Sequence, residues 1–365
     1  MSFSQRHTHI AKGIGILLLL YYHMFIDFRD FHSFLALIAH SCVSLFVFLS
    51  AFGLTISLDK AYSSKTRGIS WMAKHVYKLE VFFWPHFLVG IIIFYAVYKR
   101  SLLAYYGNIG KVLLDFFCVS DMLGMRPLLG VWWYMGLAIC VVLVLVLFAK
   151  AYNKLGLVLI PVTYVIMIVA PAIFRTDGFD NPGPYKGYLL AVCLGVFFAR
   201  NKFFEKYIAL LKKQSQAFML MLTLLFLLVI TGLTFALLLV RGNYFSDILM
   251  VPQLVKTINA VLFVFLGVNL AEFKVTSRVF EFLGKLSDDM FIIHVALTVA
   301  FPPITRLTGI PEVNYLIFLA SSILISMAFK KLKALSRYDK LMEKLYGKIN
   351  INIGRPKTAG TDEAK

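Results

Sequence analysis

The sequence predicts an all-α integral membrane protein with about ten transmembrane helices and both termini in the cytoplasm. Of its 365 residues 60% are hydrophobic, and the mean hydropathy is +0.79. Apolar runs of about 18 or more residues recur along the chain, each long enough to cross the roughly 30 Å hydrocarbon layer. The candidate spans are residues 10–28, 34–56, 81–98, 131–149, 157–174, 187–199, 216–240, 250–270, 289–305 and 314–330.

The net charge of +18 is explained by membrane topology. With ten spans and a cytoplasmic N-terminus, most of the 37 Lys and Arg residues lie in segments on the inner side. This asymmetry is the positive-inside rule, and the same charge attracts anionic lipids of the inner leaflet. We therefore expect membrane lipids as partners and no nucleic acid.

One polytopic domain is expected over residues 1–330, because no connection between spans is long enough to fold alone. The first span lacks a small-residue cleavage site and is interrupted by Lys12 and His23, so it is not predicted to be a signal peptide. Residues 331–365 form a basic cytoplasmic tail. Leucines recur there at helical spacing among lysines, which is typical of an amphipathic helix on the inner leaflet, and the last dozen residues are expected to be disordered.

Three ionisable residues of the first span indicate the functional centre. His23 follows Lys12 by eleven residues and precedes Asp27 by four, so at about 100° per residue all three share one stripe of a helix. Ionisable groups inside a bilayer are expensive and usually mark a pathway or a reaction centre. Near the midplane His23 suits a general base, with Asp27 orienting its ring. The alternatives are a packing role for His23 and an ordinary interfacial position for Asp27.

A basic cluster, Lys74-His75-Val-Tyr-Lys78, precedes the third span. Cationic groups at the inner mouth of a bundle suit a phosphorylated cytoplasmic donor, although inner loops are lysine-rich in any case. Two other histidines inside predicted spans, His40 and His294, are expected to be structural hydrogen-bonding residues.

Aromatic and cysteine residues of the spans have simpler interpretations. Trp132-Trp-Tyr134 at the start of the fourth span is typical of an interfacial aromatic belt, with the lining of an acceptor site as the alternative. The four cysteines lie in apolar segments without metal-ligand spacing. We interpret them as buried small hydrophobes and predict no metal site.

Four segments, in order along nearly the whole chain, resemble motifs of the membrane acyltransferase 3 family. They are Lys12 with His23 after ten intervening residues, Ser44-Leu-Phe-Val-Phe-Leu-Ser-Ala-Phe-Gly53, Lys74-His-Val-Tyr-Lys-Leu-Glu-Val-Phe-Phe-Trp-Pro85 and Phe282-Leu-Gly-Lys-Leu-Ser-Asp-Asp-Met-Phe-Ile-Ile-His294. The family includes O-antigen and peptidoglycan O-acetylases and exopolysaccharide succinyltransferases.

The chain departs from the family pattern at a few positions. Lys12 stands where arginine is usual, and a lysine is a point charge instead of a bidentate fork. The basic motif before the third span contains no arginine. Ala51 replaces the usual glycine of the second motif, and Asp288-Asp289 stands where a small or aromatic residue is common.

The resemblance implies an O-acyltransferase in the bacterial inner membrane. Its donor would be cytoplasmic acyl-CoA, most often acetyl-CoA, and its acceptor a hydroxyl of a cell-surface or lipid-linked glycan. No permanently bound cofactor is expected, and other polysaccharide-assembly proteins are candidate partners. The residues implied to hold the donor phosphates are Lys12, Lys74, His75 and Lys78. His23 would be the general base or a transient acyl carrier, oriented by Asp27.

A different class of function uses the same residues. Midplane His and Asp side chains also relay protons in transporters, so a non-catalytic exporter or flippase for a glycan or lipid-linked intermediate is the alternative. An exporter has no use for CoA, whereas the enzyme must bind it.

Overall fold

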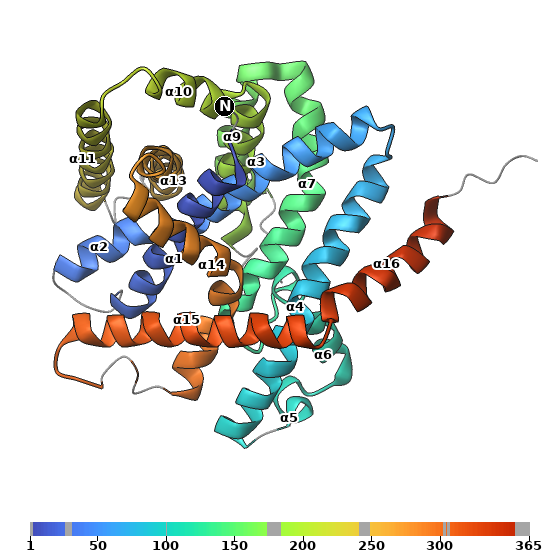
Figure 1. Ribbon diagram of the computed structural model, residues 1–365. Helices are drawn as coiled ribbons and strands as arrows, with labels where there is room; N and C mark the ends of the chain where they lie inside the picture. Colours follow the sequence, from blue (N-terminus) through green and yellow to red (C-terminus); the bar gives the residue numbers. More distant parts are fainter. Residues whose placement is uncertain are drawn as a thin grey trace, which may run out of the picture.

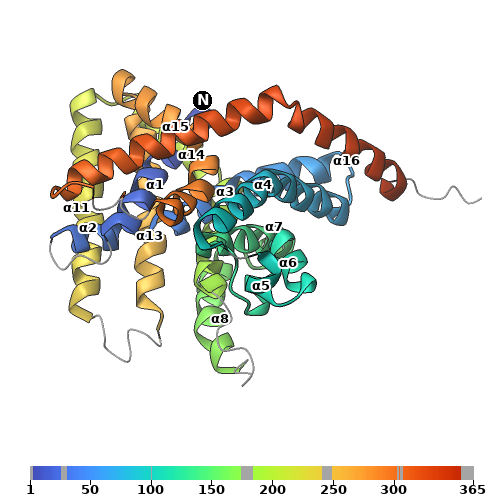
Figure 2. The ribbon, with the colours of Figure 1, turned by 90° about the horizontal axis from the view of Figure 1, so that it is seen from below.

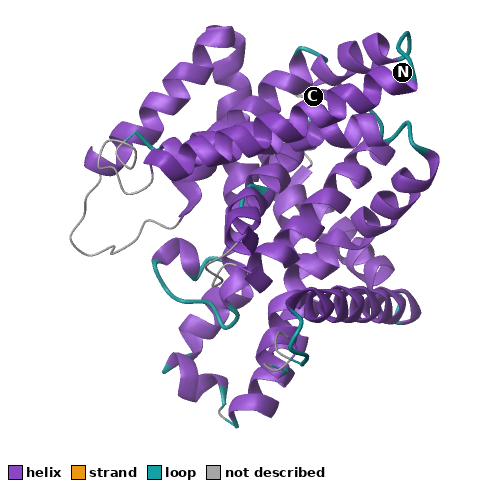
Figure 3. Cartoon of the chain, turned by 90° about the vertical axis from the view of Figure 1, so that its left-hand side faces the viewer, coloured by secondary structure: helices purple, strands orange, loops and turns teal. Residues whose placement is uncertain are grey.

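The structure, a computed structural model, describes residues 3–25, 31–99, 101–173, 184–240, 249–301, 304 and 307–354. All regular elements of these residues are helices, which confirms the predicted all-α class for this part of the chain (Figure 1, Figure 3). The α-helices are α1 (Gln5–Phe25), α2 (Phe31–Ala39), α3 (Cys42–Ser63), α4 (Gly68–Tyr98), α5 (Leu102–Tyr106), α6 (Ile109–Phe116), α7 (Trp133–Leu155), α8 (Leu159–Ile173), α9 (Leu189–Arg200), α10 (Phe203–Leu211), α11 (Gln216–Val240), α13 (Val251–Leu270), α14 (Lys274–Ala300), α15 (Pro311–Leu335) and α16 (Tyr338–Gly354). The 3₁₀ helices are η1 (Asp121–Leu123), η2 (Gly130–Trp132), η3 (Gly156–Val158) and η4 (Pro184–Tyr188).

The described residues contain 6 helical stretches long and apolar enough to cross a membrane, or 7 if one bent pair counts as a span. They are Phe31–Ser63, Gly68–Tyr98, Gly130–Val169, Gln216–Val240, Val251–Leu270 and Pro311–Leu335, with Tyr185–Arg200 and Phe203–Leu211 as the pair. The chain is therefore a multi-pass membrane protein by composition, while the number of ten spans stays a prediction. One predicted span, residues 131–149, lies within the stretch Gly130–Val169, and the next, residues 157–174, overlaps its end. The helices α1 and α14 are not among the 6 stretches, although they have 21 and 27 residues, and both carry ionisable side chains in their interiors.

Helix α1 lies at the centre of the bundle and packs on α2, α3, α13, α14 and α15 (Figure 1). Its closest approach is to α14, where two glycines allow the backbones to touch. A Cβ atom on Gly13 would lie 2.0 Å from the carbonyl oxygen of Phe280, and one on Gly284 would lie 1.7 Å from that of His9. Larger residues would separate the helices, so these glycines fix which residues of α1 face α14.

A second close contact joins α3 to α9. A Cβ atom on Gly195 of α9 would lie 2.7 Å from the Cβ atom of Ala51. Ala51 is the position where the family motif usually has glycine. The small residue that this crossing requires is supplied here by α9.

The C-terminal helix is anchored to α4 through a proline. Pro85 lies inside α4, and because proline has no N–H, the carbonyl four residues earlier loses its helical donor. That carbonyl, on Val81, accepts a hydrogen bond of 2.9 Å from the hydroxyl of Tyr338. Tyr338 begins α16, which is separated from α15 by a turn at Arg337, where φ is 52°. Figure 2 shows α15 running along one side of the bundle with α16 continuing outward from its end.

A buried ionic network ties three helices together. The Oδ1 atom of Asp289 on α14 lies 2.7 Å from the Nζ atom of Lys333 on α15 and 3.1 Å from Nε2 of His86 on α4. The ammonium group of Lys333 also lies over the rings of Phe82 and Phe329. A buried charge is tolerated only when it is paired in this way.

The segment between α4 and α7 is organised around one carboxylate. Buried Asp115 of α6 accepts hydrogen bonds from the backbone N–H of Leu128 (2.9 Å), the hydroxyl of Ser120 (2.7 Å) and the hydroxyl of Tyr106. Burial raises the pKa of the Asp115 carboxyl above its usual value, and the three hydrogen bonds oppose that shift.

Candidate active site

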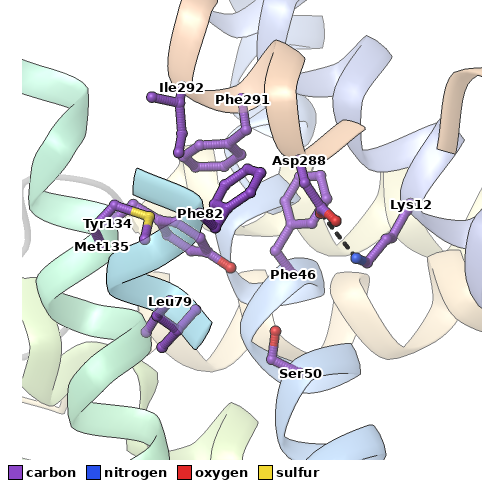
Figure 4. A pocket seen from close by; sticks show the side chains of 11 residues that line it. Lys12, Phe46, Ser50, Leu79, Phe82, Tyr134, Met135, Asp288, Phe291 and Ile292 are labelled. Carbon is purple, nitrogen blue, oxygen red and sulfur yellow. Dashed lines mark hydrogen bonds and ion pairs between the residues drawn. The ribbon is translucent and has the colours of Figure 1, made fainter. Parts of the chain in front are cut away.

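The charged end of the site is an ion pair across the α1–α14 crossing. The Nζ atom of Lys12 lies 2.9 Å from Oδ1 of Asp288. Both side chains border a cavity of about 220 Å³ between α1, α3, α4, α7 and α14. Figure 4 shows this pair beside the cavity with Ser50, Tyr134 and Phe291 on other walls. Asp288, which departs from the family motif, therefore pairs with Lys12, which stands where the family usually has arginine.

A neighbouring cavity extends this space toward the basic cluster. It has a volume of about 390 Å³ and shares Lys12, Ser50 and Tyr134 with the first cavity. His75 and Lys78 line it as well, so three of the four residues predicted to hold the donor meet around one cavity.

The ring of His75 is held in place by its own helix and by α3. Its Nδ1 atom lies 2.9 Å from the carbonyl oxygen of Trp71, and its Nε2 atom lies 3.3 Å from Oγ of Ser57. With the proton on Nδ1, the carbonyl accepts that N–H and the serine hydroxyl donates to Nε2. The indole N–H of Trp71 donates to the same serine oxygen at 3.2 Å.

The fourth predicted donor residue lies elsewhere. Lys74 is exposed and lines a third cavity, of about 380 Å³, which Lys78 also borders. Neighbouring side chains of a helix point about 100° apart, so Lys74 and the adjacent His75 face different cavities. Lys78 is thus common to the second and third cavities.

His23 lies at the other end of the stripe on α1, exposed and about 16 Å along the axis from Lys12. Its ring centroid is 4.8 Å from that of His294 on α14, and the ring planes are inclined by 49°. His294 was predicted to be a structural hydrogen-bonding residue, and its contact with His23 was not predicted. Its position at the end of the fourth family motif is the signal that could have found this pair.

One ring nitrogen of His294 lacks a hydrogen-bond partner among the described residues. The residue is 0% exposed, and its Nδ1 atom lies 3.2 Å from the carbonyl oxygen of Met290. With the proton on Nδ1, that carbonyl accepts the N–H and Nε2 keeps a lone pair. Nε2 has no hydrogen-bond partner among the described residues. The ring also packs edge-on against Phe291, which lines the cavity of Lys12, so one aromatic residue separates the histidine pair from that cavity.

Other predicted residues have mixed outcomes. Asp27 falls in 26–30, outside the described residues. His40 stacks on Tyr22 of α1, with 4.4 Å between ring centroids. Trp132 does not face lipid as an aromatic belt would, because it is 3% exposed and packs on Phe83 and Phe87 in the core.

The remaining aromatic and cysteine predictions are borne out only in part. Tyr134, the last residue of the expected belt, lines both of these cavities, which fits the alternative interpretation that this segment lines a site. Cys42, Cys118 and Cys193 are buried as expected, whereas Cys140 is only half-buried.

Comparison with models of known protein families shows which family the chain belongs to. The family model described as an acyltransferase domain matches residues 9–331, nearly the whole chain. The chain belongs to the acyltransferase 3 family. The match contains both residues of the histidine pair and the basic cluster of α4, and it ends within α15. No curated protein and no solved structure matches the chain.

Proposed function

We propose that this acyltransferase 3 family protein is an integral-membrane O-acyltransferase of the bacterial inner membrane. It moves an acyl group, which we take to be acetyl, from cytoplasmic acyl-CoA to a hydroxyl of a cell-surface or lipid-linked glycan. The observation that supports this most is the placement of two residues of α1. Lys12 lines one cavity together with His75 and Lys78, and the ring of His23 packs on that of His294, whose Nε2 atom has no hydrogen-bond partner among the described residues. The proposal includes ten spans with both termini in the cytoplasm, so that the basic cluster faces the donor.

In this proposal the donor binds first at the basic residues near the cytoplasmic face. Lys12, Lys74, His75 and Lys78 hold its phosphates, and its pantetheine arm extends through the connected cavities toward the histidine pair. Charge-assisted contacts to phosphate are the stronger class of hydrogen bond. The apolar walls around the arm exclude water from the thioester, whose hydrolysis would waste the donor.

His23 is the general base. It takes the proton of the acceptor hydroxyl while the hydroxyl oxygen attacks the thioester carbonyl carbon. The carbon–sulfur bond then breaks, and the departing thiolate takes the proton back from the His23 imidazolium, which yields the acyl ester and free CoA. Nε2 of His294 offers a lone pair that stabilises the imidazolium in between, and Asp27 orients the His23 ring. A transient acyl-His23 intermediate is the alternative route with the same products.

An exporter would use the histidine pair as a proton relay, and binding of CoA separates the two classes. We would titrate the purified protein in nanodiscs with CoA by calorimetry and follow CoA release from acetyl-CoA, with and without a crude pool of cell-envelope glycan. The proposal predicts saturable CoA binding and glycan-dependent CoA release. Binding without release from acetyl-CoA would call for a succinyl donor in the same assay. Absence of both binding and release would favour the exporter.

A further inference from the structure

The third cavity lies next to the two cavities that contain Lys12 and is built partly from the C-terminal helix. It has a volume of about 380 Å³ and lies between α4 and the α15–α16 segment. Its basic lining residues are Lys74, Lys78 and Lys333, and its aromatic lining residues are Tyr77, Tyr338 and Tyr346. Asp339 and Glu343 of α16 complete the polar lining.

Helix α16 forms a defined wall of this cavity. The hydroxyl of Tyr338 donates to the carbonyl that Pro85 leaves without a helical donor, and the hydroxyl of Tyr77 donates to the carbonyl of Met342 at 2.9 Å. The rings of Tyr77 and Tyr346 lie 5.0 Å apart between centroids and are inclined by 37°. Contacts from both helices therefore hold tyrosine rings of α4 and α16 side by side at the cavity.

The cavity adjoins the proposed donor path. Lys78 borders both this cavity and the one that contains Lys12 and His75. Phe82 borders both this cavity and the one beside the Lys12–Asp288 pair. The third cavity therefore lies next to the other two, with these two side chains as shared walls.

The lining suits a nucleotide more than a simple anion. Lysines pair with phosphates, and tyrosine rings stack on a base, since every base has a π-face. The carboxylates of Asp339 and Glu343 can accept hydrogen bonds from an amino group of the base or from ribose hydroxyls. The family match ends at residue 331, so α16 lies beyond the matched acyltransferase domain.

We propose that this cavity binds the adenosine 3′,5′-bisphosphate end of the donor CoA, with α16, which lies beyond the matched domain, as one of its walls. Lys74 and Lys78 pair with the phosphates, and the adenine ring stacks on Tyr346. This assignment rests on the proposed function for its donor, and it adds the residues and the helix that recognise the nucleotide. It also explains the exposed position of Lys74, away from Lys12.

The test uses the full-length protein in nanodiscs of neutral lipid, which removes competition from anionic headgroups. The probe is adenosine 3′,5′-bisphosphate, with its Kd measured by calorimetry. Tyr346→Ala should raise this Kd about tenfold, the order of a lost base–aromatic stack, and Tyr346→Phe should leave it unchanged. Lys74→Met should also raise it, and this exposed position does not contribute to folding of the core. Leu345→Ala, next to Tyr346 but outside the cavity lining, is the matched control and should bind as the wild type does.

Kinetics with two donors separate this proposal from the proposed function. Tyr346→Ala should raise KM for acyl-CoA and leave kcat unchanged, while turnover of an acyl-pantetheine donor, which lacks the nucleotide, should not change. An unchanged Kd in both Tyr346→Ala and Lys74→Met would overturn the nucleotide site, even if wild-type turnover is normal. Equal losses with both donors would also overturn it. Binding that depends on Tyr346 and Lys74, without transfer from either donor, would keep the site and remove the enzyme assignment.

Discussion

His294 of α14 packs against His23 of α1, with 4.8 Å between their ring centroids, although the two residues come from opposite ends of the chain. The contact depends on the glycines at which α1 and α14 touch. It gives the exposed histidine a buried neighbour whose Nε2 atom has no hydrogen-bond partner among the described residues. The histidine pair, and not His23 alone, is the unit we expect to handle protons.

Removal of the His294 lone pair should slow the chemical step without weakening donor binding. His294→Leu should lower kcat about 10- to 100-fold, the range for a lost hydrogen bond to a charged group, and leave KM for acyl-CoA unchanged. His294→Asn keeps an acceptor oxygen and should lose less. Steady-state kinetics of both variants check this prediction. A parallel fall in kcat for the leucine and asparagine variants would contradict it and indicate a packing role.

Asp288 should compete with the donor for Lys12. Its side chain is 59% exposed, so the ion pair with Lys12 is worth only about 0–1 kcal/mol. Asp288→Asn should therefore lower Kd for CoA by about two- to fivefold, and Lys12→Met should raise it. Titration calorimetry measures both. The double variant serves as the control, because Asp288→Asn should have no effect on CoA binding once Lys12 is absent.

The α1–α14 crossing should tolerate no side chain at its glycines. Gly284→Ala places a methyl group within 1.7 Å of the carbonyl oxygen of His9, so it should destabilise the fold by about 1–3 kcal/mol or more. It should also lower turnover, because it displaces His294 relative to His23. Gly232→Ala is the matched control, since a Cβ atom at that helical position meets nothing within 4 Å. Thermal unfolding in detergent should show a lower Tm only for the first variant.

Much of the first helix could be predicted from the sequence. The spacing of Lys12 and His23 fixes their common stripe, because one continuous helix joins them. Their partners could not be predicted, since Asp288 and His294 reach them only through a tertiary crossing. In the C-terminal tail, too, tertiary contacts could not be predicted from the sequence. Its leucine spacing indicates a helix, but the break at Arg337 and the docking of α16 follow from contacts with α4.

The basic cluster illustrates a local limit. Lys74 and Lys78 were predicted to act together, and they do share one cavity. Only Lys78 also reaches the cavity of Lys12, because the direction of each side chain depends on its position around α4. Trp132 was interpreted as part of an interfacial aromatic belt, with the lining of an acceptor site as the alternative, whereas packing against Phe83 buries it.

Stability should fall as pH rises through the titration of Asp115. Burial raises the pKa of this carboxyl in the folded protein above its unfolded value of about 3.9. The folded state then binds the proton more tightly, so the stabilisation is fully present below the unfolded pKa and is lost as pH rises through the folded pKa. Asp115→Asn should remove this part of the pH dependence. Tm values of both proteins between about pH 3.5 and 7.5 check it, and exposed Glu272→Gln should retain the wild-type profile.

The most direct test of the account compares wild type and His23→Ala in nanodiscs. Both proteins are titrated with CoA, and CoA release from acetyl-CoA is followed in the presence of envelope glycan. Loss of a general base typically lowers the rate by about 10²–10⁴, so His23→Ala should bind CoA with unchanged Kd and release it at that reduced rate. Wild-type turnover in His23→Ala would contradict the assignment of the reaction to the histidine pair of α1 and α14.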